Sequence, residues 1–171
     1  MLEPLNNTLA KNIITEARTW LDTPWQHNQC LKGVGCDCVN FPHAVYKACG
    51  VPMPDLFNYS RTPKGEQILN YLDECLKLIG VAEDLYDWSD RYSSKSIPLQ
   101  GLIDKSQPGD LLVYSRVFGG VPGHLAIRTN YGKIEALFKQ GVTETGLGDS
   151  LKLLAVYRIY EVCLPKNSSK S

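Results

Sequence analysis

Apolar residues recur at helical spacing in three segments of the first half of the chain. Residues three or four positions apart share one face of an α-helix, so the pattern predicts amphipathic helices that bury that face. The predicted helices are Thr8–Leu21, Cys38–Cys49 and Gly65–Ile79. Asn7 or Thr8 can cap the start of the first helix, and Gly50 is a stop signal for the second.

The pattern changes after Pro108-Gly109-Asp110, where short β-prone runs alternate with glycine-rich or Asn-Tyr-Gly turns. The predicted strands are Leu111–Ser115, His124–Thr129, Lys133–Phe138 and Leu153–Cys163. Val51–Lys64 is expected to form a loop, and Val81–Ser106 to be irregular with a short helix at Ala82–Trp88. Helices that precede strands predict an α+β domain with an antiparallel sheet.

Length and composition limit the kind of protein. The 171 residues, 43% of them hydrophobic, suit one domain at residues 1–165 ahead of a polar tail at 166–171. Lys plus Arg and Asp plus Glu each number 18, so the basic excess of a general nucleic-acid binder is absent. The sequence has no run of about 18 apolar residues that would predict a membrane span. The N-terminus has no signal-peptide pattern, so we expect synthesis in the cytoplasm.

Three of the six cysteines cluster around the predicted start of the second helix. The six are Cys30, Cys36, Cys38, Cys49, Cys75 and Cys163. Without a secretory signal, reduced thiols are expected. At a helix start, unpaired N–H groups and the helix dipole lower the pKa of a thiol and can bind an oxyanion, which makes Cys38 a candidate nucleophile. The alternative is that Cys38 packs as a small apolar residue, and its position alone leaves both interpretations open.

A cysteine nucleophile needs a base, and the chain has three histidines. His43 follows Cys38 on the same predicted helix at an offset that points it away from the thiol. His27 lies in the preceding loop, within reach of the site. His124 begins a predicted strand, and papain-type sites place their histidine on a rigid strand of this kind.

The base must be oriented by a group that accepts its second N–H. A hairpin that turns at Asn130-Tyr131-Gly132 would put Glu135 on the strand beside His124, where the two side chains can meet. Glu135 is therefore the leading candidate, with Gln140 as a weaker one. An exposed carboxylate without a role is the alternative interpretation of Glu135.

Several stretches of the chain, taken in order, resemble the NlpC-type family of bacterial and phage cell-wall cysteine peptidases. The matching stretches are Thr23-Pro24-Trp25, Gly35-Cys36-Asp37-Cys38-Val39-Asn40-Phe41, Pro108-Gly109-Asp110-Leu111-Leu112-Val113-Tyr114, Gly123-His124-Leu125-Ala126-Ile127 and Gly132-Lys133-Ile134-Glu135-Ala136. The Asp-Cys stretch is a weak signal alone but is specific together with the Pro-Gly-Asp and Gly-His stretches. The longer pattern from Thr23 to Cys38 is most similar to phage-tail and gene-transfer-agent members.

The resemblance implies a papain-like α+β fold, in which N-terminal helices pack on a C-terminal antiparallel sheet and the nucleophile lies at a helix N-terminus. It implies hydrolysis of peptide bonds in peptidoglycan stem peptides, next to D-glutamate or diaminopimelate. The catalytic residues would be Cys38, His124 and Glu135. The residues expected to support the substrate or the oxyanion are Asp37, Trp25 and His27. Neither a cofactor nor a metal is implied.

Three positions depart from the family pattern. Val39-Asn40 follows Cys38, whereas the family usually has a glycine after Cys-Ser. Trp25 stands where the family often has tyrosine, and an indole N–H can donate a hydrogen bond but not accept one. Glu135 is charged where a neutral or imidazole group is usual, although a carboxylate can stabilise an imidazolium.

Two other functions stay open at this point. One is a zinc site formed by His27, Cys30, Cys36 and Cys38, although their spacing is not a usual one for zinc. The other is a non-catalytic binding or assembly module of a phage tail. As a peptidase, the protein would bind peptidoglycan peptides or muropeptides and act on cell-wall material within a phage or prophage particle. Neither nucleic acid nor a membrane is an expected partner.

Overall fold

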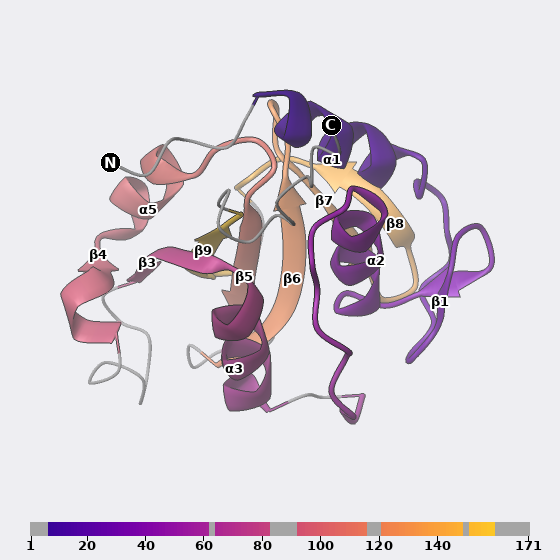
Figure 1. Cartoon of the computed structure of the whole chain (residues 1–171), viewed down its shortest axis with the longest axis horizontal. Coiled ribbons are helices and arrows are strands. Elements are labelled where there is room, and N and C mark those ends of the chain that lie inside the picture. Colours follow the sequence, from indigo (N-terminus) through magenta and orange to yellow (C-terminus); the bar gives the residue numbers. More distant parts are fainter. Residues whose placement is uncertain (1–6, 62–63, 83–91, 116–120, 149–150, 160–171) are drawn as a thin grey trace, which may run out of the picture.

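The computed structural model describes residues 7–61, 64–82, 92–115, 121–148 and 151–159, and consists of helices packed against a seven-stranded sheet (Figure 1). The helical elements are α1 (Asn7–Arg18), α2 (Asn40–Ala48), α3 (Gly65–Cys75), the 3-10 helix η1 (Ser93–Lys95) and α5 (Leu99–Lys105). The strands are β1 (Cys30–Leu31), β2 (Gly35–Cys36), β3 (Lys77–Ala82), β4 (Ser96–Ile97), β5 (Leu111–Ser115), β6 (Pro122–Arg128), β7 (Lys133–Leu137), β8 (Gly141–Thr145) and β9 (Leu153–Arg158).

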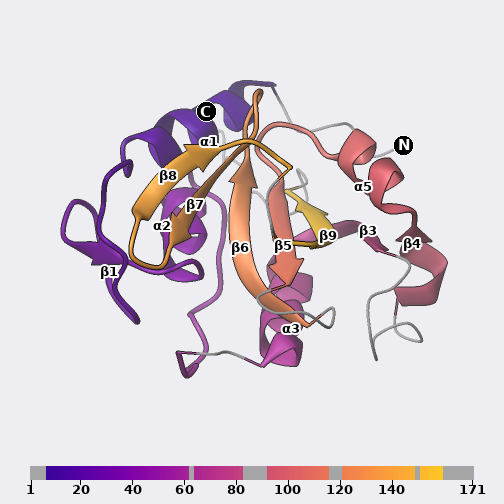
Figure 2. The same ribbon diagram turned by 180° about the vertical axis from the view of Figure 1, so that it is seen from behind.

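The sheet has the strand order β4-β3-β9-β5-β6-β7-β8, while β1 and β2 form a separate hairpin. The pairings within the large sheet are antiparallel except for β3 with β4. Helices α2 and α3 lie in front of the sheet in Figure 1 and behind it in Figure 2, so both cover the same face. The arrangement confirms the predicted α+β class with N-terminal helices on a largely antiparallel sheet.

Two apolar clusters hold these layers together, one on each face of the sheet. The larger cluster joins the helices to the sheet and includes Ile13 of α1, Phe41 of α2 and Ile127 of β6. The smaller one includes Leu102 of α5 and Ala126 of β6. Neighbouring residues of one strand thus belong to opposite clusters, as the two-residue repeat of a β-strand requires.

The third predicted helix is too long, because α3 ends at Cys75 and Lys77–Ala82 forms β3. The apolar run that begins at Leu76 suits either a helix or a strand, and pairing with β9 decides in favour of the strand. The structure also adds elements that the pattern did not predict, namely the β1–β2 hairpin, η1, β4, α5 and the polar strand β8. Most of the predicted helix Ala82–Trp88, the end of the last predicted strand and the tail at 166–171 lie outside the described residues.

Candidate active site

Cys38 lies directly after the β1–β2 hairpin, in the turn that leads into α2. Helix-type hydrogen bonding begins one residue before it, because the Phe41 N–H donates to the Asp37 carbonyl at 3.0 Å. The side chain of Cys38 is buried between the helix and β6, where its sulfur lies 3.9 Å from the Gly123 carbonyl oxygen. The thiol is therefore held at the junction of the helical layer and the sheet.

Asp37 caps this helix with its side chain. Its Oδ1 accepts hydrogen bonds from the backbone N–H groups of Val39 at 3.1 Å and Asn40 at 2.9 Å. Among the described residues, none accepts a hydrogen bond from the backbone N–H of Cys38. That N–H lies at the positive end of the helix and is suited to binding a developing oxyanion.

Tyr59 fixes the Asp37 carboxylate from the other side, a role that the sequence did not reveal. Its hydroxyl lies 3.0 Å from each carboxylate oxygen and accepts a hydrogen bond from Asn40 Nδ2 at 2.6 Å. Burial, and then the charge of Asp37, raise the pKa of Tyr59, so it stays a protonated donor. The backbone N–H of Asn28 donates to Asp37 Oδ2 at 2.8 Å. Asp37 thus connects the loop that precedes the β1–β2 hairpin, the loop of Tyr59 and the start of the helix.

Replacing Asp37 with alanine is expected to destabilise the protein by about 2–4 kcal/mol, since it removes a helix cap and leaves buried donors without their acceptor. Chemical denaturation measures this loss. The exposed residue Asp104, which accepts a hydrogen bond from Gln100 on α5, provides the matched control. If Asp37→Ala is no less stable than Asp104→Ala, Asp37 does not have this structural role.

His124 is the histidine that the fold brings to Cys38. It lies near the start of β6 and is buried; its imidazole is hydrogen-bonded to Glu135 and lies close enough to the Cys38 side chain to interact with it. Burial acts to lower the pKa of His124, but the contacts with Cys38 and Glu135 outweigh it and raise the pKa to about 9. The imidazole is therefore stabilised in its protonated form.

Glu135 completes this array from the adjacent strand β7. His124 Nε2 lies 2.7 Å from Glu135 Oε2, so Nε2 carries the proton of this bond and Nδ1 faces Cys38. Oε1 of Glu135 accepts hydrogen bonds from the buried Lys133 ammonium and from the Thr145 hydroxyl, the latter at 2.8 Å. Burial alone would raise the pKa of Glu135, but His124 and Lys133 lower it to about 2. Glu135 is thus ionised and fully buried.

These two pKa shifts predict how stability depends on pH. The depressed pKa of Glu135 supplies stability that is present above its ordinary value of 4.5 and is lost as the pH falls towards 2. The raised pKa of His124 supplies stability that is present below 6.5 and is lost as the pH rises towards 9. The wild-type protein is therefore expected to be most stable between these limits.

In Glu135→Gln the loss of stability on the acid side, about 3 kcal/mol for a shift from 4.5 to about 2, should largely disappear. Urea unfolding at a series of pH values measures it. The exposed residue Glu66 on α3 provides the control Glu66→Gln, which should keep the wild-type profile. If the unfolding free energy of Glu135→Gln falls below pH 4.5 as steeply as that of the wild type, the buried ion pair is contradicted.

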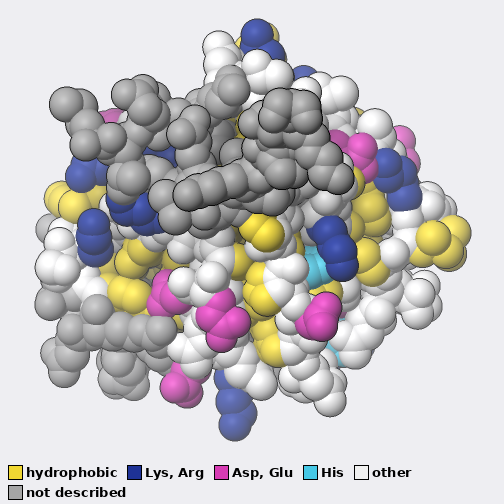
Figure 3. Space-filling view, in the orientation of Figure 1, with side chains coloured by type: hydrophobic (Ala, Val, Ile, Leu, Met, Phe, Trp, Pro, Cys, Tyr) yellow, Lys and Arg dark blue, Asp and Glu magenta, His cyan; other side chains and the backbone are white. Residues whose placement is uncertain are grey.

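The other two histidines face different partners. His43 Nδ1 lies 2.6 Å from the Tyr71 hydroxyl, and burial, followed by the charge of Lys47, lowers the pKa of His43. His27 Nδ1 lies 3.5 Å from Asp37 Oδ2, and its ring meets that of Tyr59 edge to face. His27 is thus placed beside the helix cap, and the structure does not pair it with Cys38. Figure 3 shows a small area of histidine surface beside a basic side chain and hydrophobic side chains.

Trp25 lies next to the segment that leads to Cys38. Its backbone forms an isolated parallel β-bridge with Cys36. Its ring stacks on that of His27, with centroids 6.5 Å apart. Trp25, His27 and Asp37 are therefore neighbours of the Cys38 turn.

The cysteines near Cys38 do not gather with His27 into a metal site. Cys30 and Cys36 are partners across the β1–β2 hairpin, one exposed and the other buried. Burial raises the pKa of the Cys36 thiol to about 12, which makes it a poor metal ligand or nucleophile. Within the described part of the chain, no group of three or more His, Cys, Asp or Glu side chains is arranged to hold a metal ion. Cys163 lies outside the described residues.

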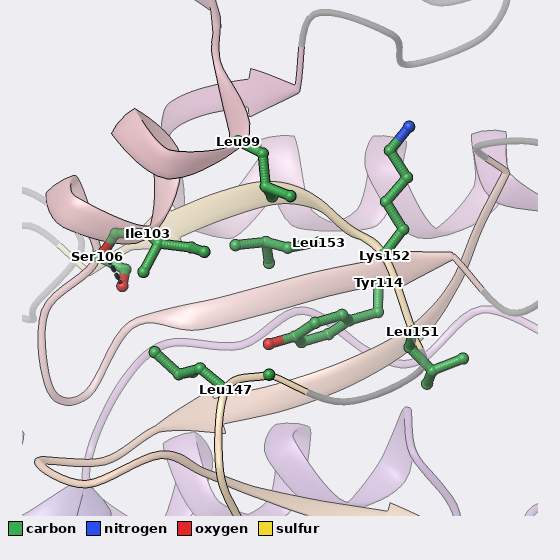
Figure 4. A pocket seen from close by; sticks show the side chains of 9 residues that line it. Leu99, Ile103, Ser106, Tyr114, Leu147, Leu151, Lys152 and Leu153 are labelled. Carbon is green, nitrogen blue, oxygen red and sulfur yellow. Dashed lines mark hydrogen bonds between the residues drawn. The ribbon is translucent and has the colours of Figure 1, made fainter.

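A separate pocket of about 330 Å³ opens between α5 and the loop around Leu147. Figure 4 shows the Tyr114 ring between Leu147 and Leu153 in this pocket. Tyr114 also packs against His124, with ring centroids 6.4 Å apart. None of the groups of the Cys38–His124–Glu135 array lines the pocket, so it is distinct from the reactive centre.

The thiol before α2, the imidazole on β6 and the carboxylate on β7 are placed as a nucleophile, a base and an orienting group would have to be. Two solved structures have a similar fold. A Staphylococcus aureus protein described as similar to a lipoprotein, of the NLP/P60 family, superposes with a TM-score of 0.58 at 15% identity, over 93% of this chain and 44% of that one. An NlpC/P60 family protein from Bacillus cereus superposes with a TM-score of 0.54 at 22% identity, over 96% of this chain and 42% of that one.

The chain therefore has the fold of NlpC/P60 family proteins and spans less than half the length of these two structures. No family model matches the sequence. No curated protein matches it either. Among the described helices, none has the length and apolar character needed to cross a membrane.

Proposed function

We propose that this protein is a thiol hydrolase that cleaves peptide bonds in the stem peptides of peptidoglycan. The observation that supports the proposal best is the close approach of Cys38, His124 and Glu135, with His124 hydrogen-bonded to Glu135, on the fold of NlpC/P60 proteins. Each member of the array sits on a different element, so its assembly depends on the fold as a whole. The cell-wall substrate is inferred from the family resemblance of the sequence motifs.

The reaction would proceed through an acyl-enzyme. The Cys38 thiolate attacks the carbonyl carbon of the scissile amide, and the Cys38 backbone N–H binds the oxyanion that forms. The protonated His124 then donates its proton to the leaving amine as the C–N bond breaks. In the second half, neutral His124 takes a proton from water and the hydroxide attacks the thioester; the Cys38 thiolate then leaves beside the protonated His124 as the acid product is released.

Glu135 would hold His124 in the reactive orientation throughout this cycle. The bond from Nε2 to the carboxylate leaves Nδ1 directed at the thiol, and the negative charge stabilises the imidazolium. Lys133 and Thr145 fix the opposite oxygen of the same carboxylate. His124 and Glu135 can therefore keep their positions while His124 gives its proton to the leaving amine and takes one from water.

Digestion of purified peptidoglycan tests the proposal. Wild-type protein is incubated with peptidoglycan sacculi and with isolated muropeptides, and the products are identified by mass spectrometry. New amine and carboxylate termini within the stem peptide, absent with Cys38→Ala, are the expected result. Intact muropeptides after prolonged incubation of correctly folded protein would rule the proposal out and favour a binding or assembly module. Action on cell-wall material as part of a phage or prophage particle is a further proposal, based on the motif likeness to phage-tail members.

A further inference from the structure

Cys30 and Cys36 face each other across the β1–β2 hairpin, which Figure 1 shows at one edge of the molecule, apart from the large sheet. The two residues are directly opposite in the antiparallel register, and Leu31 and Gly35 form the next pair towards the turn. Side chains of directly opposite residues project from the same face of a hairpin. The two thiols therefore lie on one side of it, where a covalent link could join the strands.

The backbone of Cys36 shows which kind of cross-strand pair this is. Its N–H donates to the Pro24 carbonyl at 3.0 Å, and its carbonyl accepts from the Gln26 N–H at 2.9 Å. Both groups point away from Cys30, so Cys30 and Cys36 form a non-hydrogen-bonded pair of the ladder. The Cα atoms of such a pair are typically about 4.5 Å apart, and their side chains are closer than in a hydrogen-bonded pair. That spacing lies within the roughly 4.4–6.8 Å over which a disulfide joins two Cα atoms.

The surroundings of the two sulfurs allow them to meet. Cys30 is exposed as a residue, and its sulfur lies 3.7 Å from the Asn40 carbonyl oxygen, a contact that a thiol makes only weakly. Rotation about the χ1 torsion of Cys30 can therefore move the sulfur towards Cys36 at little cost. Burial above all raises the pKa of the Cys36 thiol to about 12, and the nearby charge of Cys30 contributes.

The hairpin turn holds the two strands in this register. Gly33 adopts a φ of +76°, and its N–H donates to the Thr23 hydroxyl at 3.0 Å. The Val34 N–H donates to the Leu31 carbonyl at 3.0 Å. Because the turn is fixed in this way, a link between the strands needs no shift of the backbone. Disulfides that leave the backbone undistorted are the stabilising ones.

The electrostatics of the two thiols favour a disulfide that forms slowly and resists reduction. Burial raises the pKa of both Cys36 and Cys30, and the charge of Asp37 adds to the rise in each. Neither thiol is therefore stabilised as a thiolate. A disulfide is strongly oxidising when its reduced form is stabilised, and this pair lacks that stabilisation. The oxidised form is thus favoured outside a reducing cytoplasm.

We propose that Cys30 and Cys36 are a site of reversible oxidation, at which a cross-strand disulfide links the hairpin next to Cys38. With a small disulfide such as oxidised glutathione, the Cys30 thiolate attacks one sulfur and one glutathione thiolate leaves. Cys36 then attacks the Cys30 sulfur as its thiolate, and the second glutathione leaves. Two cysteines are oxidised, one glutathione disulfide is reduced, and the two thiol protons pass to the glutathione thiolates. Cys38 takes no part, so the link is independent of the proposed function.

Mass spectrometry of the oxidised protein tests the link directly. Folded wild-type protein is incubated with oxidised glutathione until the reaction is complete, its remaining thiols are alkylated, and it is digested with trypsin without reduction. Cleavage after Lys32 separates the two cysteines, so the disulfide should join peptides 19–32 and 33–47. Fragmentation should place the alkyl group of the second peptide on Cys38. Reduction should separate the two peptides.

Two substitutions and a matched control assign the cross-link. Cys30→Ser, at an exposed position, and Cys36→Ala should each abolish it. Cys49→Ala, which removes a half-buried thiol at the end of α2, should leave it unchanged. Oxidised wild-type protein should unfold about 4–8 °C above the reduced protein, the size expected when a disulfide closes so short a loop without strain. In Cys30→Ser the two unfolding midpoints should coincide.

A link that fragmentation places on Cys38, or glutathione retained on Cys30 without any cross-link, would overturn the proposal. An unfolding midpoint that does not rise on oxidation would also overturn it, because the link would then strain the hairpin. Digestion of peptidoglycan by the reduced protein tests the proposed function separately, so failure of one proposal is distinguishable from failure of the other.

Discussion

Cys38→Ala is expected to lower the rate of stem-peptide cleavage by at least about 10⁴-fold, because the acyl-enzyme cannot form without the thiol. The fold should be retained, since alanine replaces a small, buried side chain and leaves the Asp37 cap of α2 in place. Single-turnover assays with a stem peptide measure the rate, and circular dichroism with urea unfolding establishes the fold. The fast phase of labelling by a thiol-reactive probe at neutral pH should be lost from the same variant.

Cys30 provides the matched control for this substitution. It lies on the neighbouring hairpin and is exposed as a residue, although its sulfur lies 3.7 Å from the Asn40 carbonyl oxygen. Partial removal of the sulfur from water, together with the Asp37 charge, raises the pKa of its thiol. Cys30→Ala should therefore keep the wild-type rate and the fast labelling phase. A Cys38→Ala protein that still cleaves the peptide, or that still shows that fast phase, would exclude Cys38 as the nucleophile.

His124→Gln is expected to lower kcat/KM by about 10³- to 10⁵-fold, since glutamine can neither hold the thiolate as an ion pair nor transfer the proton. Glutamine is preferred to alanine because its amide can still donate a hydrogen bond to Glu135, so the buried carboxylate keeps a partner. The rate of thiol labelling near pH 7 should fall together with the activity. Both effects have one cause, the loss of the imidazolium beside Cys38.

His27→Gln is the control that separates the two histidines near the site. His27 faces Asp37 and the Tyr59 ring, so its replacement should change the rate by less than about tenfold. Loss of activity in His27→Gln with a near-normal rate in His124→Gln would reverse the assignment of the base. Comparable large losses in both variants would show that the helix cap and the base are coupled.

The sequence predicted that Cys38 and His124 lie together better than it predicted the residues around them. Cys38 and His124 could be located because each stands at the start of a predicted element and each belongs to an ordered set of motifs. The contact of His124 with Glu135 followed from strand register, which a short hairpin turn largely determines. Tyr59 and Lys133 could not be found this way, since a loop residue carries no periodic signal and a buried lysine contradicts the usual preference of its side chain.

The errors in the fold have a similar origin. Leu76 to Ile79 is apolar at nearly every position, so its periodicity cannot distinguish a helix from a strand, and only pairing with β9 decided it. Strand β8 was missed because its outward positions are polar and it lies at an edge of the sheet. The β1–β2 hairpin pairs two residues per strand, which is too short for any pattern to reveal. In each case the deciding contacts were distant in sequence.

The attachment of Cys38 to β6 has a consequence for biosynthesis. The thiol and the Gly123 carbonyl that it contacts are 85 residues apart in the chain. A ribosome therefore releases the helix that bears Cys38 well before the strands that bear His124 and Glu135. Until those strands pair and dock, the cysteine has no base beside it, so the nascent chain would lack the proposed hydrolase activity. Onset of that activity would thus report completion of the domain.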